Sequence, residues 1–164
     1  MINPSYYNSY IDLVCENDVL FTLDEQMNFT YAFLLTIDEK KANYAYAAGK
    51  WTIKEIVGHL IDSERVFAYR ATRFARKDKT DLPGFEENDY VANANFASRS
   101  LADLAEELLL LRKSNMHLFN SFTDEMMSRT GTANGGEISV EAILYITAGH
   151  QKHHIKIIND RYLK

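Results

Sequence analysis

The amino-acid sequence predicts an all-α protein, a four-helix bundle with long connecting loops. Apolar residues recur at three- and four-residue steps in four long stretches, which is the spacing of one face of a helix. No run alternates apolar and polar residues well enough to predict a strand. The chain has 164 residues, of which 46% are hydrophobic and 25% charged, as in an ordinary globular domain. We therefore expect a single domain over residues 1–164.

The first part of the chain is expected to form an arm and one helix. Tyrosines and apolar residues within residues 1–17 predict a packed arm with a helical turn. The apolar spacing that follows predicts a helix over roughly residues 18–37. Residues 38–41 are typical of a short charged turn, and residues 44–50 of a connector that Gly49 interrupts.

The second helix begins at a clear signal. Thr52 and Glu55 fit a capping box, in which a hydroxyl and a carboxylate bond free backbone amides. Arginine and lysine follow in the last expected turn, where positive charge suits the helix dipole. These features predict a helix over roughly residues 52–77, with His59 at the border of its apolar stripe.

A long connection over residues 78–99 comes next. Long connections inside a compact domain are often functional. This one has a turn at Pro83-Gly84, and its aromatic residues, among them Phe85 and Tyr90, favour packing over a site.

The last two helices follow. Ser100 begins the third, with Asp103 at the capping-box position. Residues 122–138, with three glycines, are expected to be a second loop. Ser139 then caps a fourth helix, predicted over roughly residues 139–162.

Charge and cysteine content restrict the functional class. The net charge of -5 argues against a general nucleic-acid surface or an anionic-membrane surface. Cys15 is the single cysteine, which excludes a disulfide framework and favours a reducing compartment. We expect this thiol to be packed and not catalytic. No signal-peptide pattern or long apolar run is present, so we expect a cytoplasmic protein.

A histidine pair near the end of the chain is the strongest chemical signal. His150 and His154 are four residues apart, about 40° of rotation and about 6 Å of rise on a helix, so they share one face. That face continues the stripe of Val140, Ile143 and Leu144. Two imidazoles therefore replace core residues, and a buried imidazole needs a partner. A metal ion is such a partner.

Two motifs resemble a known family. Residues 50–64 read KWTIKEIVGHLIDSE, and Gly149-His150-x-x-x-His154 follows in the last helix. Together with Leu82-Pro83-Gly84-Phe85 and the terminal Arg161-Tyr162-Leu163, they resemble the DinB-like superfamily, in particular its YfiT-like members. The resemblance covers essentially the whole chain.

The resemblance implies a function and a ligand set. His59, His150 and His154 are expected to hold a divalent ion, most simply zinc or nickel. The family implies a homodimer that transfers a low-molecular-weight thiol to an electrophilic small molecule. A metal-dependent hydrolase and a non-catalytic metal-binding or sensor protein are the alternatives. Three neutral ligands keep the charge of the ion and leave positions open, so water or a thiol bound there deprotonates more easily.

Several other residues are weaker candidates. Asp62, one turn after His59, could orient a ligand or contact substrate, or be an ordinary solvated carboxylate, and Glu64 and Arg65 have the same two readings. His153 points about 100° away from His154 and is expected beside the site or on the surface. His117 is expected to be structural or exposed. Trp51 is expected to be a packing anchor at the start of the second helix.

Overall fold

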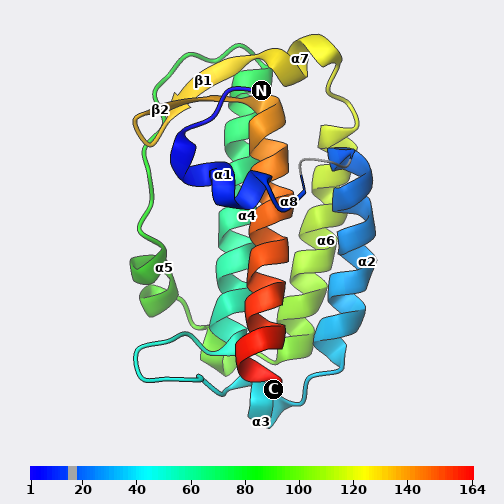
Figure 1. Cartoon of the computed structure of the whole chain (residues 1–164), viewed down its shortest axis with the longest axis vertical. Coiled ribbons are helices and arrows are strands. Elements are labelled where there is room, and N and C mark those ends of the chain that lie inside the picture. Colours follow the sequence, from blue (N-terminus) through cyan, green and yellow to red (C-terminus); the bar gives the residue numbers. More distant parts are fainter. Residues whose placement is uncertain (15–17) are drawn as a thin grey trace.

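The computed structural model describes residues 1–14 and 18–164 and confirms the all-α prediction. Four long helices lie side by side (Figure 1): α2 (Val19–Leu35), α4 (Ile53–Ala75), α6 (Leu101–Phe119) and α8 (Val140–Ile157). Helix α2 packs chiefly on α6, and α4 on α8. A π-helical turn over Ile158–Tyr162 continues α8. None of the described helices is long and apolar enough to cross a membrane.

Side-chain caps begin the four helices. The predicted capping box of α4 is present, with bonds in both directions between Thr52 and Glu55. Ser100 accepts a hydrogen bond from the Asp103 amide at the start of α6. The Asp103 carboxylate, however, accepts from Arg99 at 2.5 Å, so at α6 the structure gives only the serine half of the expected box.

The connections are more structured than the sequence predicts. The expected charged turn is the short helix α3 (Glu39–Ala42), which Asp38 caps. The long connection contains α5 (Glu87–Asn93) and a 3-10 turn over Phe96–Ser98. These helices are one or two turns long, too short for a periodic pattern to reveal.

The expectation of no strand is wrong. Between α7 (Asp124–Ser128) and α8, strands β1 (Thr130–Ala133) and β2 (Gly136–Ser139) form an antiparallel hairpin. Asn134 and Gly135 make its turn with φ of 51° and 74°. An Asn-Gly pair is the strongest short hairpin signal, but strands of four residues with a glycine in each are too short to show alternation. Leu82 forms a parallel bridge with Ala133, so the preceding loop runs along the hairpin.

The N-terminal arm is present as predicted. A 3-10 turn (Ser5–Tyr7) and α1 (Asn8–Ile11) lie across α8 (Figure 1). Gly149 permits this crossing, because a Cβ there would lie 2.0 Å from the carbonyl oxygen of Tyr10. The expected packing of Cys15 lies outside the described residues.

A buried polar layer divides the core into two apolar parts. One part lies toward the hairpin end of the bundle, and the other toward α3. Between them, Arg112 of α6 donates to both carboxylate oxygens of Glu64 of α4 at 2.7 and 2.9 Å. It also donates to the Gln151 side chain of α8 at 2.5 Å, and Gln151 donates to Thr30 of α2 at 2.7 Å. One network therefore joins all four long helices.

Replacing Arg112 with Met is expected to lower the free energy of unfolding by about 3–5 kcal/mol, because the Glu64 carboxylate stays buried and unpaired. Urea denaturation measures the loss. The double variant Glu64→Leu/Arg112→Met should recover part of it, since it leaves no isolated charge. The control Arg99→Met removes an arginine from more exposed pairs with Asp103 and Glu107 and should cost less than about 1 kcal/mol. Equal losses from the two single variants would contradict the importance of the buried pair.

Candidate metal centre

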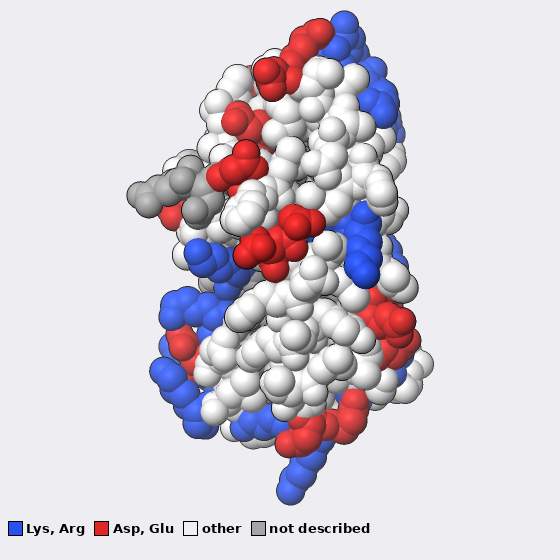
Figure 2. All heavy atoms as spheres, turned by 90° about the vertical axis from the view of Figure 1, so that its right-hand side faces the viewer, with Lys and Arg blue, Asp and Glu red and all other residues white. Residues whose placement is uncertain are grey.

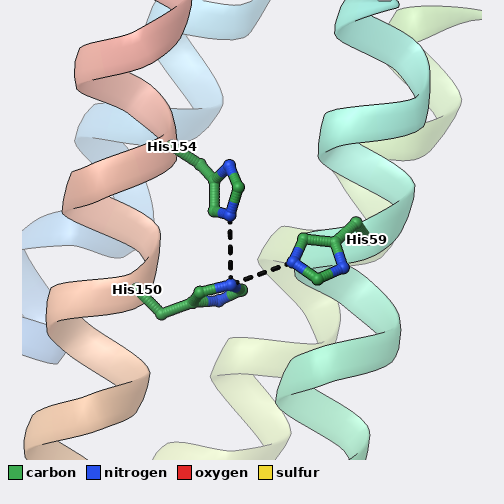
Figure 3. A group of neighbouring side chains, drawn as sticks. All are labelled: His59, His150 and His154. Atoms are coloured by element: carbon green, nitrogen blue, oxygen red, sulfur yellow. Dashed lines mark hydrogen bonds between the residues drawn. The ribbon is translucent and has the colours of Figure 1, made fainter. Parts of the chain in front are cut away.

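Helices α4 and α8 bring three histidines together. His59 comes from α4, and His150 and His154 from one face of α8, as the four-residue spacing predicts. All three rings point into the space between the helices (Figure 3). The His150 Nε2 atom lies 2.9 Å from His59 Nε2 and 3.1 Å from His154 Nε2.

Burial keeps the three imidazoles neutral. Each is less than a tenth exposed. Burial is the main cause that lowers the pKa of His59 to about 4, against an opposing effect of Glu87, and the pKa of His154 to about 3. Burial and the neighbouring histidines hold the pKa of His150 well below its usual value. All three rings therefore carry free lone pairs at neutral pH. Protons compete with a metal ion for imidazole nitrogens, and with the ordinary histidine pKa metal binding should weaken below about pH 6. The lowered pKa values of these histidines move this competition to lower pH.

The donor set fits a divalent ion. Three nitrogens about 2.0–2.1 Å from a tetrahedral zinc ion lie roughly 3.3 Å from one another, and the two distances from His150 Nε2, 2.9 and 3.1 Å, are close to that value. Ser63 Oγ lies 3.4 Å from His59 Nδ1 and can hold that ring in one orientation. Within the described ranges, no fourth histidine, cysteine or carboxylate joins the group. Three protein ligands with an open position are typical of catalytic sites, and four of structural sites.

A cavity of about 340 Å³ lies beside the histidines. Its volume is at the lower end of the range for small-molecule sites. Six of its lining residues are aromatic: Tyr6, Tyr7 and Tyr10 from the arm, Trp51 just before α4, Phe67 of α4 and Phe85 of the loop after α4. Its other polar residues are Ser63, Arg70, Glu87 and Asn134.

Aromatic rings also hold the histidines in place. The Trp51 ring lies 4.8 Å from the His59 ring, and the Tyr10 and Phe67 rings lie 5.2 and 5.8 Å from that of His150. Tyr162 donates to the Trp51 carbonyl at 2.5 Å, which ties the end of the chain to the start of α4. Trp51 therefore packs, as predicted, and also forms part of the cavity wall.

Two predicted neighbours of the site lie outside this cavity. Asp62 is half-buried, which raises the pKa of its carboxyl, and it faces Arg65 at 3.6 Å. The half-buried His153 ring packs on Tyr10 at 5.3 Å and on His154 at 5.1 Å. Neither lines the cavity, so their suggested contact with ligand or substrate stays a prediction.

The remaining candidates have clear structural places. His117 is exposed on α6, and Glu64 is the buried partner of Arg112. Arg65 pairs with Glu107 at the surface. In the long connection, Phe85 lines the cavity, while exposed Tyr90 packs on it with ring centres 5.1 Å apart.

Sequence reasoning missed four polar residues of the cavity: Ser63, Arg70, Glu87 and Asn134. Arg70 lies on the same stripe of α4 as His59, eleven residues later, and helical spacing could have revealed it. Glu87 and Asn134 come from α5 and from the hairpin turn. Only the folded connections bring these two residues to the histidines.

Comparisons with known proteins agree with this geometry. The family model described as the DinB superfamily matches residues 22–158. A Geobacillus kaustophilus protein named "Putative metal-dependent hydrolase" is 27% identical over 125 residues, which are 72% of this chain and 67% of that protein.

Two solved structures share the fold. Bacillus subtilis YfiT, described as "a probable metal-dependent hydrolase with an unusual four-helix bundle topology", has a TM-score of 0.73 and 19% identity over 98% of this chain and 87% of its own. The DinB-like protein YjoA, also from Bacillus subtilis, has a TM-score of 0.63 and 18% identity over 87% of each chain.

The metal-free protein is expected to lose stability as the pH falls from about 6.5 toward 4. The unfolded chain takes up protons at the ordinary histidine pKa near 6.5, whereas folded His59 and His154 do so only at about 4 and 3. Between these values the unfolded state holds more protons, so lower pH favours unfolding. Urea unfolding with a chelator at pH 7, 6 and 5 measures the slope. A variant with all three histidines changed to Gln is the control; an equally steep slope in it would assign the effect to other groups.

Proposed function

The chain belongs to the DinB superfamily, and from that premise we propose that it is a metal-dependent hydrolase whose divalent ion, zinc or nickel, is held by His59, His150 and His154. The observation that carries the proposal is the convergence of three buried, neutral imidazole nitrogens beside a cavity. The names of the Geobacillus protein and of YfiT support hydrolysis. A divalent ion bound there supplies a nucleophile near neutral pH by lowering the pKa of water or of a thiol.

The residues around the histidines would prepare the site for this chemistry. Ser63 and the rings of Trp51 and Phe67 hold the imidazoles in fixed orientations, so little reorganisation is needed when the ion binds. The aromatic walls would bind the apolar part of a substrate and exclude bulk water around it.

Glu87 is the residue best placed to accept a proton. It is the sole carboxylate among the described residues that line the cavity. It is close enough to His59 to raise the pKa of that imidazole against the effect of burial. In hydrolysis, the Glu87 carboxylate would take the proton that the attacking water gives up.

Transfer of a small thiol is the second candidate. Among the described residues, no cysteine or lysine lines the cavity, so the nucleophile would come from outside the protein. A thiol deprotonates more easily than water, and it would depend less on a carboxylate. Glu87 therefore distinguishes the two reactions.

Metal analysis combined with two activity assays tests the proposal. We expect about one zinc or nickel ion per chain, and metal-dependent cleavage of some members of a panel of esters and amides. His150→Ala should lose most of the metal and the activity, because it removes the central ligand, whereas His117→Ala, on the exposed face of α6, should keep both. Full metal content in a variant with all three site histidines changed to Ala would contradict the assignment.

Glu87→Gln separates hydrolysis from thiol transfer. The variant should retain metal but lose about 10²–10⁴-fold in hydrolysis, the usual contribution of a general base. A thiol panel with a generic electrophile forms the second arm. Metal-dependent adduct formation that survives Glu87→Gln, without ester or amide cleavage by the wild type, would favour transfer. Metal binding without either reaction would favour a binding or sensor protein.

We also propose that the protein is a homodimer that pairs through the face of α2 and α6. Large apolar side chains of these helices are exposed: Phe21, Phe29, Leu35 and Leu110. Figure 2 views this side of the molecule and shows a broad area in its lower half without charged side chains. Exposed apolar area of this kind supports a protein contact. The exposed tyrosines, by contrast, are dispersed over several elements.

Introducing positive charge on this apolar face tests the dimer. In light scattering at micromolar concentration, the wild type should have about twice the chain mass of 18.9 kDa. Phe29→Lys/Leu110→Lys should shift it to the monomer, because each lysine would have to be desolvated at the contact. Tyr69→Lys, at an exposed tyrosine on α4, is the control and should remain dimeric. A monomeric wild type would contradict the proposal.

A further inference from the structure

Arg70 occupies the cavity wall on the same stripe of α4 as the metal centre. His59, Ser63, Phe67 and Arg70 follow one another at steps of four, four and three residues, and all four line the cavity. The Cα atoms of His59 and Arg70 are therefore roughly 16 Å apart along the helix. A ligand that lies along this stripe meets the histidines at one end and the guanidinium at the other.

The charge of Arg70 has no protein partner among residues 1–14 and 18–164. Its side chain is 4% exposed, yet no carboxylate of the described residues lies within ion-pair distance. Arg112, the other deeply buried arginine, bonds both oxygens of Glu64. A buried guanidinium without an anion is costly. The cavity beside Arg70 is the place from which an anion could come.

The protein contacts of Arg70 do not need its charge. Its Nη2 donates to the Pro83 carbonyl at 2.8 Å, which fixes the loop after α4 to the helix. One neutral N–H would serve for that bond, and a guanidinium carries five. Arg70 also lies beside the Tyr7 hydroxyl: burial raises the pKa of Tyr7, and the guanidinium partly opposes that shift. A phenol that keeps its proton can donate a second hydrogen bond to an anion.

We infer that the substrate carries a carboxylate, and that Arg70 binds this group while the reacting bond lies at the histidines. The inference rests on the proposed function, because it takes the cavity as the substrate site. A planar guanidinium matches a carboxylate with two parallel hydrogen bonds. One cation on a wall that also holds Glu87 suits a single negative charge better than a doubly charged phosphate. Arg70 would thus select acids over their neutral analogues and set their direction in the cavity.

Binding of a matched acid and amide to the metal-free protein tests this inference. Calorimetry with 3-phenylpropionate and 3-phenylpropionamide compares a charged and a neutral form of one ligand, and phenyl phosphate forms a third arm. The acid should bind at least about tenfold more tightly than the amide, the usual scale of a hydrogen bond to a charged group. Arg70→Gln, which keeps an N–H donor for Pro83, should remove this preference, and Arg70→Lys should keep part of it.

The controls separate this inference from the metal proposal. A variant with His59, His150 and His154 changed to Ala should keep the acid preference, because Arg70 is intact. Loss of the preference there, with retention in Arg70→Gln, would mean that the histidines bind the acid and would overturn the inference. Equal affinity of acid and amide in the wild type would also overturn it, as would tighter binding of phenyl phosphate than of the acid. If circular dichroism shows that Arg70→Gln does not fold, Arg70→Lys becomes the deciding variant. An acid preference in Arg70→Lys equal to that of the wild type would contradict a role for the planar guanidinium.

Discussion

The ion pair between Glu64 and Arg112 is the interaction on which the rest of the structure depends. It lies at the level where the apolar core is interrupted, and its hydrogen bonds reach α2, α4, α6 and α8. Gln151, the member from α8, lies between His150 and His154 in the chain. Because Gln151 must face Arg112, the rotation of α8 is fixed, and the two histidines are turned toward α4. The buried polar layer, although its charges cost desolvation energy, thus sets the direction in which the histidines of α8 point.

Burial affects the Glu64–Arg112 ion pair and the three histidines in opposite ways. The ion pair tolerates it because each charge is bonded on several sides, whereas the histidines respond by staying neutral. Neutral imidazoles with converging nitrogens cannot all satisfy one another, and His154 Nδ1 is buried without a partner among the described residues. The fold therefore holds a site whose hydrogen bonding is incomplete by itself, and a cation bound to the folded state would stabilise it by mass action.

The sequence predicted the bundle and part of the site, and the reasons for success and failure are physical. His150 and His154 could be found because a helical repeat puts them on the buried face. His59 was found only through its resemblance to a family motif, since nothing in its own helix distinguishes it from a satisfied core histidine. The hairpin, Glu87 and Asn134 depend on how irregular segments fold back onto the bundle, and no periodicity describes that. Arg70 was within reach of the helical spacing, but its missing ion partner is visible only in three dimensions.

The bundle holds the metal ligands, whereas the connections form the outer wall of the cavity. The ligand atoms and the ring contact from Phe67 lie on α4 and α8, whose positions the polar layer fixes. The outer wall of the cavity comes from the arm with Tyr6 and Tyr7, the loop with Phe85, and the hairpin turn with Asn134. The Gly149 crossing and the bond from Arg70 to Pro83 are two of the contacts that hold these segments on the bundle. Changes at Phe85 and Asn134, which line the cavity from the connections, can therefore alter what it admits while the helices that carry the ligands stay in place. Arg70 joins the two parts because it stands on α4 and holds the loop.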